Sequence, residues 1–252
     1  MKRGIFLLTV CFLAGLKMTI AAQEYHGITG LLQVPDAEAD SAGTFRGGIA
    51  WVDKRMLPDM GSFNDGIPFS APCYTIGFSV WEWLQLSYSG TIGKIHGNKS
   101  SNEFNYNQDR HVNLKLRPLK EGRCWPAVGI GWDDIGNLEV FGVKESMTSN
   151  NYFEDLYVAV SKHLDVKGYE LGVHLAYRYY TWKKNKDRQG FCGGMTVRPA
   201  FYRPLRGIVE WDGLGVNVGA DVLLWRHLFV QAALAHGQGF SGGVGYQYRI
   251  KF

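Results

Sequence analysis

The amino-acid sequence predicts an all-β fold, a transmembrane antiparallel up-and-down β-barrel of about 12 strands. Three observations carry this prediction. The chain ends on a strand-like segment with one apolar and one polar face, it begins with a segment typical of exported proteins, and apolar and polar residues alternate through most of the 252 residues. Alternate side chains of a strand point to opposite faces, so this pattern gives each strand one apolar face.

The C-terminal segment 242–252 alternates up to its last residue. One parity carries aromatic and aliphatic side chains, and the other carries only small, polar or charged residues. Lipid and a neighbouring strand would cover such an edge in a membrane barrel, whereas in water it invites aggregation. A terminal Phe on such a strand resembles the assembly signal of bacterial outer-membrane proteins. Tyr246, Tyr248, Ile250 and Phe252 are therefore expected to form an assembly signal that meets outer-membrane lipids and the barrel-assembly machinery.

The N-terminal segment has the three-part layout of a secretory signal peptide. Lys2 and Arg3 give a positive start, residues 5–16 form an apolar run, and residues 19–22 are small enough for cleavage. The run is shorter than the ~20 residues that a membrane-spanning helix needs. We expect residues 1–22 to be removed and the protein to reside in the outer membrane of a Gram-negative bacterium.

Two further regions follow the expected signal peptide. Residues 23–43 precede the first expected strand and either plug the barrel mouth or hang free, and residues 44–252 form the barrel. Alternating or strand-like segments are found at 45–52, 74–80, 84–89, 111–117, 128–132, 156–161, 171–179, 191–201, 207–212, 216–224, 228–236 and 242–252. This number of segments is even, as bacterial barrels require.

The connections between these segments fall into two length classes. Trp81-Glu82 and Leu164-Asp165 are expected to be tight turns on the periplasmic side. Longer connections, rich in Gly, Asn, Ser or charged residues, are expected at the cell surface; they are 54–71, 93–108, 134–150 and 183–190.

Composition narrows the possible functions. The formal net charge is +4, and three of the positive residues lie in the expected signal peptide, so the remaining chain is near neutral and has no signature of nucleic-acid binding. Beyond the signal, Cys73, Cys124 and Cys192 are odd in number and far apart. They give no disulfide framework and no metal-binding spacing, although one pair could oxidise in the periplasm. No cofactor is predicted.

Two carboxylates stand out as candidate site residues. Glu210 and Asp212 share a parity opposite Val209 and Trp211, so they point into the lumen if Trp211 faces lipid. The favoured interpretation is a structural polar network with cations across the interior, and the alternative is a constriction that contacts sugar hydroxyls. The expected cationic partners are Lys115, Arg117, Lys162 and Arg198.

Other candidate sites are weaker. Asp133 and Asp134 could bind a divalent cation, but a turn before Gly136 explains them more simply, and no metal site is predicted. The sequence lacks the common hydrolase, metalloprotease and nucleotide-binding motifs, so we expect no enzyme. A lone Ser and His on strands could still act in a lipid-modifying barrel, and the sequence leaves many candidate pairs open. They combine Ser87, Ser89 or Ser161 with His111, His163, His174, His227 or His236.

Several ordered motifs resemble one protein family. Residues 27–37, GITGLLQVPDA, resemble the opening G-x-T-G-L-x-x-x-P-x-A of YjbH-like proteins. Segments 111–136, 157–162 and 209–219 are similar to its later blocks, with Trp211 where the family usually has Tyr. The resemblance implies an outer-membrane barrel associated with exopolysaccharide and capsule production, and no defined chemistry.

The expected function is therefore support of the export or surface organisation of an extracellular polysaccharide, with that polysaccharide and periplasmic export proteins as partners. Two alternatives remain open from the sequence. A small passive porin would have the same alternating strands, and a lipid-modifying barrel enzyme would add a catalytic pair to them. Conductance in a planar bilayer separates the first from the favoured function, and the lipid profile of a deletion strain separates the second.

Overall fold

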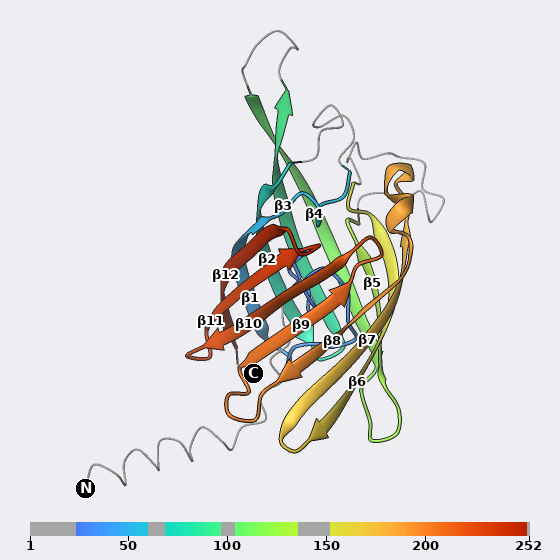
Figure 1. The fold of residues 1–252 in the computed structure, drawn as a ribbon, viewed down its shortest axis with the longest axis vertical. Coiled ribbons are helices and arrows are strands. Elements are labelled where there is room, and N and C mark those ends of the chain that lie inside the picture. Colours follow the sequence, from blue (N-terminus) through green and yellow to red (C-terminus); the bar gives the residue numbers. More distant parts are fainter. Residues whose placement is uncertain (1–23, 60–68, 97–103, 136–151, 251–252) are drawn as a thin grey trace, which may run out of the picture.

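Twelve strands form one closed antiparallel barrel in the computed structural model, which describes residues 24–59, 69–96, 104–135 and 152–250 (Figure 1). The strands are β1 (Thr44–Val52), β2 (Ala71–Trp81), β3 (Leu84–His96), β4 (Phe104–Leu119), β5 (Ala127–Asp133), β6 (Asp155–Val166), β7 (Tyr169–Tyr180), β8 (Gly190–Arg198), β9 (Leu205–Trp211), β10 (Val216–Leu224), β11 (Leu228–Ala235) and β12 (Gly239–Arg249). Each strand pairs with its neighbours in sequence, and β1 pairs with β12 to close the barrel. The predicted fold class and approximate strand number are confirmed.

The barrel wall separates an apolar outer face from a polar inner face. Along β12, Val244, Tyr246 and Tyr248 are 49%, 53% and 51% exposed, whereas the alternate positions face inward. On β4 the alternation places His111 and Asn113 inside and Val112 outside. The exposed apolar band is the surface that lipid covers in outer-membrane barrels.

The expected assembly signal lies partly on this band. Tyr246 and Tyr248 face outward, and Ile250 is 43% exposed just after β12 ends. Phe252 lies outside the described residues, as does the expected signal peptide, residues 1–22.

Three sequence predictions about strand ends are wrong. The turn expected at Leu164-Asp165 lies at Lys167-Gly168, where both residues have positive φ, as a two-residue hairpin turn requires. Much of the loop expected at 93–108 is strand, because β3 and β4 pair out to His96 and Phe104 beyond the rest of the wall (Figure 1). In this outer part of the hairpin the two backbones still pair, although apolar and polar residues no longer alternate as they do in a strand that faces lipid. The strand expected over 191–201 stops at Arg198, before Pro199.

The longest connections, β1–β2, β5–β6 and β7–β8, all lie at one end of the barrel. We call the end that carries the start of β1, the end of β12 and the short β2–β3 and β6–β7 turns the terminus end (Figure 1). The β7–β8 connection at the other end contains a 3-10 helix, η3 (Lys183–Arg188). The described residues include no helix with the length and hydropathy needed to span a membrane.

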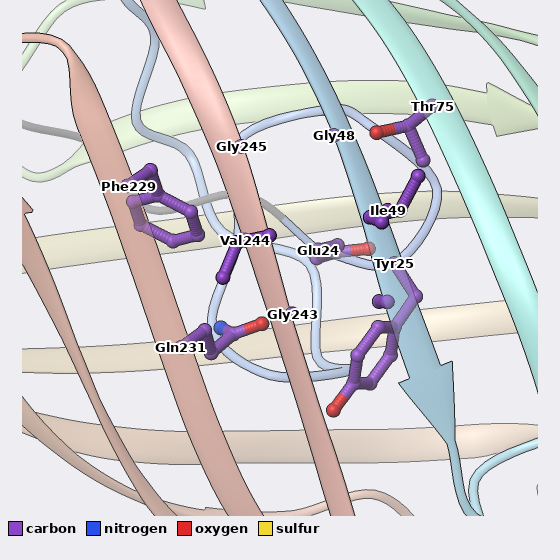
Figure 2. Close-up of a pocket in the computed structure, with 11 residues that line it drawn as sticks. Glu24, Tyr25, Gly48, Ile49, Thr75, Phe229, Gln231, Gly243, Val244 and Gly245 are labelled. Carbon is purple, nitrogen blue, oxygen red and sulfur yellow. The ribbon is translucent and has the colours of Figure 1, made fainter.

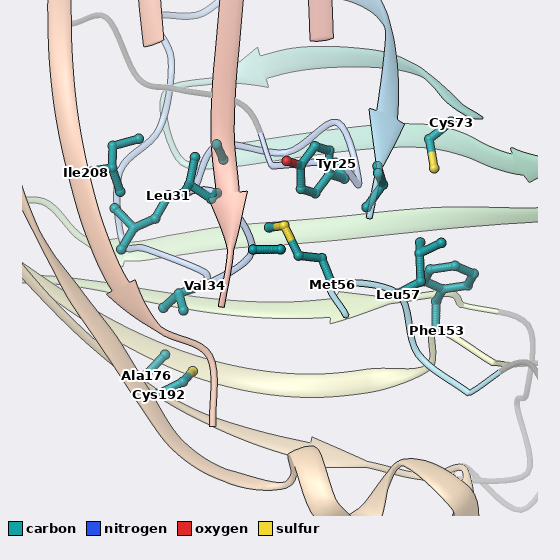
Figure 3. Close-up of a cluster of buried hydrophobic side chains, with 14 of the residues drawn as sticks. Tyr25, Leu31, Val34, Met56, Leu57, Cys73, Phe153, Ala176, Cys192 and Ile208 are labelled. Carbon is teal, nitrogen blue, oxygen red and sulfur yellow. The ribbon is translucent and has the colours of Figure 1, made fainter. Parts of the chain in front are cut away.

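The lumen is filled by the chain that precedes β1. We call residues 24–43 the plug; most of its side chains are buried, and Leu31, Leu32 and Val34 are 0% exposed. The plug side chains pack on small and apolar residues of the inner wall, among them Ile208 and Ala176, to form a hydrophobic cluster within the barrel (Figure 3). Residues 23–43 were expected to plug the mouth or hang free, and the described part lies inside the barrel.

The two wall faces should respond differently to a charge. Val244→Lys places an ammonium group on the lipid face of β12 and should cost about 2–4 kcal/mol near the membrane midplane. Gln247→Lys, on the inner parity of the same strand, should be tolerated. The measurement is the fraction of heat-modifiable folded protein in outer-membrane extracts. Equal losses in the two variants would contradict the assignment of faces.

Candidate functional site

The candidate site is the polar lumen, where side chains of the wall bind the backbone of the plug. A loop backbone inside a barrel has amide and carbonyl groups with no sheet ladder to join, so each needs another partner. Gly30 and Pro35 form an isolated bridge, and Leu31 N–H donates to the Val34 carbonyl, so the plug turns back on itself between them. The wall supplies many of the remaining partners.

Glu210 of β9 accepts hydrogen bonds from three consecutive plug amides. The N–H groups of Leu32, Gln33 and Val34 lie 2.9–3.1 Å from its carboxylate oxygens. Asn217 of β10 donates its side-chain amide to the same carboxylate at 2.9 Å. Because Glu210 is only 1% exposed, these donors replace the water that a carboxylate would otherwise hold.

A second contact fixes the start of the plug. The His26 carbonyl accepts hydrogen bonds from Ser87 and Ser89 of β3, both at 2.6 Å, and from Asn113 of β4 at 2.9 Å. Asn113 is 0% exposed and also accepts from the Asp134 N–H through its side-chain oxygen. One plug carbonyl therefore gathers three wall donors, which holds this turn of the plug against β3 and β4.

Three wall cations donate hydrogen bonds to plug carbonyls. Lys115 of β4 donates to Asp36 at 2.8 Å and to the Thr29 carbonyl at 2.8 Å. Arg206 of β9 donates to the Gly30 carbonyl at 2.9 Å and pairs with Asp221 of β10.

The third cation is Arg178 of β7. It donates to the Gln33 carbonyl at 3.1 Å and pairs with Asp155 of the neighbouring β6. Lys115, Arg178 and Arg206 are nearly fully buried. Each of them contacts both an acid and a plug carbonyl, which together replace the water that its charge has lost. Such saturation is what makes a buried charge tolerable in a low dielectric.

Asp212 has a different environment, in the turn after β9. Its carboxylate accepts from the N–H groups of Leu214 and Gly215 at 2.9 and 2.8 Å, and it contacts Asn217 and His236 at 3.0 Å. Burial acts to raise the pKa of Asp212, but these hydrogen bonds outweigh it and the pKa lies below its usual value. Asp212 therefore orders the β9–β10 turn and makes none of the plug contacts described above.

Three of the four cations that were expected to pair with Glu210 and Asp212 have other partners. Lys115 pairs with Asp36 of the plug, and Lys162 contacts Glu121 and the Gly122 carbonyl in the β4–β5 connection. Arg198 lies 3.1 Å from Glu170 at the terminus end, and Arg117 is buried on the inner face of β4. The alternation correctly predicted that Lys115 and Glu210 point into the lumen. It could not show that the plug would lie between them and bind both.

The Asp133-Asp134 pair forms part of the wall. Asp133 ends β5 and lies 3.7 Å from His26 and 4.0 Å from Arg178. Asp134 has φ 56° and accepts from the Phe153 N–H at 3.2 Å. This backbone conformation is the turn that the sequence favoured over a cation site at these two residues.

One serine–histidine pair does form. Ser161 Oγ lies 2.8 Å from His174 Nδ1, and His174 Nε2 lies 3.2 Å from Thr196 Oγ1. Ser161 also accepts from the Ala37 N–H of the plug at 2.9 Å and is 0% exposed. The third member of the chain is a threonine, where hydrolytic triads usually have an acid or an amide, and the plug covers the serine.

A small, partly open hollow lies between the plug and the β1–β12 seam (Figure 2). Glu24 and Tyr25 of the plug line one side, and Gln231 and Phe229 of β11 line the other. The wall between them carries little side-chain volume, because the inward positions of the seam include Gly48, Gly243 and Gly245.

A comparison with protein families gives the decisive match. Residues 22–163 match the family model YjbH, described as exopolysaccharide biosynthesis protein YbjH, and this covers more than half of the chain. The chain belongs to the YjbH family. The match contains the whole plug and extends into β6, so it includes His26, Asp36, Lys115 and Ser161.

Three solved structures that resemble this YjbH-family barrel are outer-membrane proteins at low similarity. The outer membrane phospholipases of Salmonella typhi and Escherichia coli each give a TM-score of 0.34 at 11% identity, over 85% of this chain and 92% and 99% of theirs. OprG of Pseudomonas aeruginosa gives a TM-score of 0.19 at 11% identity, over 85% of this chain and 100% of its own. These scores carry no functional argument. No curated protein matches the chain.

Several site residues of this YjbH-family protein were not singled out from its sequence. Asn113, Arg178, Arg206 and Asn217 all lie on inner parities of alternating strands, which was a usable signal. Their role depends on the plug, whose path through the lumen no local pattern reveals. His26 contributes through its backbone carbonyl, and a side-chain pattern cannot indicate that.

Removing the Glu210 carboxylate should loosen the plug. Glu210→Ala leaves three buried plug amides without their acceptor, and each unsatisfied group costs about 1–3 kcal/mol. We expect a lower unfolding temperature and faster protease cleavage within the plug in detergent. Glu82→Ala, which removes an exposed carboxylate paired with Lys120, is the matched control and should behave as wild type. A plug as protected in Glu210→Ala as in the control would show that this contact does not hold it.

Asp212 should make stability depend on pH in a defined direction. Its pKa is lower in the folded state, so its contribution is present above the unfolded pKa of about 3.9 and is lost as the pH falls through the folded value. Asp212→Asn should therefore lower the unfolding temperature near pH 6, while the difference from wild type shrinks below about pH 3.9. A difference that stays constant over this range would mean that the Asp212 charge is not what stabilises the turn.

Proposed function

We propose that this protein is a plugged outer-membrane barrel that supports the export or surface organisation of an extracellular polysaccharide. The single observation that carries the proposal is the YjbH match over residues 22–163, which spans the plug and the strands that bind it through His26 and Asp36. The polar lumen adds physical support. Its buried hydroxyl, amide and charged groups are of the types that bind sugar hydroxyls.

The proposed location is the outer membrane of a Gram-negative bacterium, after signal-peptide removal. Lipid would cover the exposed apolar band, and the barrel-assembly machinery would recognise the β12 end. In bacterial barrels the short turns face the periplasm and the long loops face outside, so the terminus end would face the periplasm. Periplasmic export proteins are the proposed partners at that end, and the polysaccharide is the proposed partner in the lumen or at the surface loops.

Any transport through the barrel requires the plug to move, because it fills the lumen. A polymer that crosses this barrel would have to displace residues 24–43, which break their contacts with Glu210, Lys115, Arg178 and Arg206 when they move. A role in surface organisation needs no such displacement. A passive porin is the less favoured alternative because the plug occupies the lumen that a porin leaves to water.

We further propose a non-catalytic role. The Ser161–His174 pair is the arrangement that most resembles a hydrolase site in the described residues, and the Ala37 amide of the plug hydrogen-bonds to its serine. A lipid-modifying activity would need a substrate to reach a serine that is 0% exposed. An unchanged lipid profile in a deletion strain is the expected result.

The double variant Glu210→Gln with Asp212→Asn tests the role of the lumen acids. If they only brace the plug and the β9–β10 turn, the unfolding temperature should fall, since partial loss of buried hydrogen bonds to charged groups costs about 1.5–3 kcal/mol each. Surface polysaccharide, measured per cell, should then fall only as far as the amount of folded protein does.

The other outcomes separate the alternatives. A stable, fully assembled double variant with reduced polysaccharide would mean that the acids contact a passing chain. A deletion strain with normal surface polysaccharide would refute the proposed function itself. Wild-type protein with a large steady conductance in a planar bilayer would favour the porin.

A further inference from the structure

The plug meets the wall at a second site near the terminus end, where a histidine and two glutamates converge. Glu38 belongs to the plug, Glu121 to the β4–β5 connection, and His163 to β6. One ligand atom of each lies within 4.8 Å of the other two. Three segments that are far apart in sequence thus bring one nitrogen and two carboxylate oxygens to one point.

The spacing of these atoms suits a small divalent ion. His163 Nδ1 lies 2.8 Å from Glu121 Oε2 and 3.6 Å from Glu38 Oε1. A tetrahedral zinc ion with bonds of about 2.1 Å holds its ligand atoms roughly 3.4 Å apart. The two measured distances lie on either side of this value, so small side-chain movements would complete the set.

The surroundings orient the proposed ligands. Glu121 Oε1 accepts from the His163 N–H at 2.9 Å and pairs with Lys162 at 2.9 Å, which directs Oε2 toward the histidine ring. The backbone of Glu38 is fixed on both sides, since its N–H donates to Asp36 and its carbonyl accepts from Thr29. Such outer partners hold metal ligands in place.

The charge and exposure also fit. With a neutral histidine, the two glutamates and Lys162 leave one negative charge. The other charges that act on the site are Asp36, Lys115, Arg117 and Glu170, two acids and two cations that add no net charge. The side chains of His163, Glu121 and Glu38 are 23%, 22% and 15% exposed, so an ion has access and a water molecule can take the remaining position. One imidazole nitrogen with two carboxylates favours Zn²⁺ over Ca²⁺ or Mg²⁺, which prefer all-oxygen sites.

We propose that Glu38, Glu121 and His163 form a zinc site that clamps the plug to the barrel wall. The ion displaces the proton between His163 Nδ1 and Glu121 Oε2, and that proton leaves to solvent. Because Glu38 lies on the plug, Glu121 in the β4–β5 connection and His163 on β6, the ion would hold the plug in the lumen. This proposal does not depend on the role in polysaccharide production.

The test uses untagged protein purified from membranes in detergent and stripped with EDTA. Titration with Zn²⁺ against a chromogenic chelator should show one tight site per chain, and Zn²⁺ should raise the unfolding temperature and slow proteolysis of the plug. Loss of an outer partner alone weakens metal binding about 10–100-fold, so Glu38→Gln and His163→Gln should each weaken it by at least about 100-fold. Melting curves without zinc show that each variant is folded.

Two variants control for other zinc ligands. His227→Gln changes a histidine in the turn just before β11, and Cys124→Ser removes the exposed free thiol three residues after Glu121. Both should bind zinc as wild type does. Wild-type protein with no tight zinc site would overturn the proposal and leave an ordinary histidine–glutamate ion pair. Binding that survives Glu38→Gln and His163→Gln, or that disappears in Cys124→Ser, would overturn the assigned ligands.

Discussion

The structure depends on one buried carboxylate, Glu210, and the three plug amides that it binds. A carboxylate inside the barrel is costly unless hydrogen bonds replace its water, and consecutive amides of a turn are equally costly without acceptors. The N–H groups of Leu32, Gln33 and Val34 and the side chain of Asn217 meet that need together. Neither partner would be stable in the lumen alone, so the barrel and the plug fold as complementary parts.

Other lumen contacts also satisfy a buried charge and the plug backbone together, but here the charge is positive and the plug supplies carbonyl groups. Lys115, Arg178 and Arg206 each bind a plug carbonyl and an acid at once, so their charges and the plug backbone are satisfied by the same geometry. The lumen is therefore a set of wall-to-plug bonds rather than a set of pairs across open space. Displacing the plug would remove the plug partners of several buried charged side chains, such as the carbonyls bound by Arg178 and Arg206. Any opening step must replace those partners with water or with a ligand of similar polarity, such as a chain of hydroxyl groups.

The sequence shows which face a residue takes, but it does not show what lies opposite. Alternation places Glu210 and Lys115 inside and Val244 outside, because a barrel exposes one strand face to lipid and the structure follows that rule. The partner of Glu210 is a backbone segment 177 residues away that has no alternation of its own. For the same reason, the convergence of Glu38, Glu121 and His163 could not be predicted. The β3–β4 hairpin was underestimated because pairing needs only backbone groups, whereas the alternation ends with the lipid face.

Small residues of the wall also determine where the plug lies, because they leave room for its backbone. A Cβ atom at Gly77 would lie 2.5 Å from the Gly27 carbonyl oxygen, and one at Gly129 would lie 3.1 Å from Ala37 Cα. Both neighbours are plug backbone, which cannot swing aside as a flexible side chain can. Gly77 lies on β2 and Gly129 on β5, so the wall approaches the plug closely from two directions. Hydrogen bonds alone would allow a plug that slides, whereas this steric fit selects one position, and the polar contacts of Glu210 and Lys115 are in register only there.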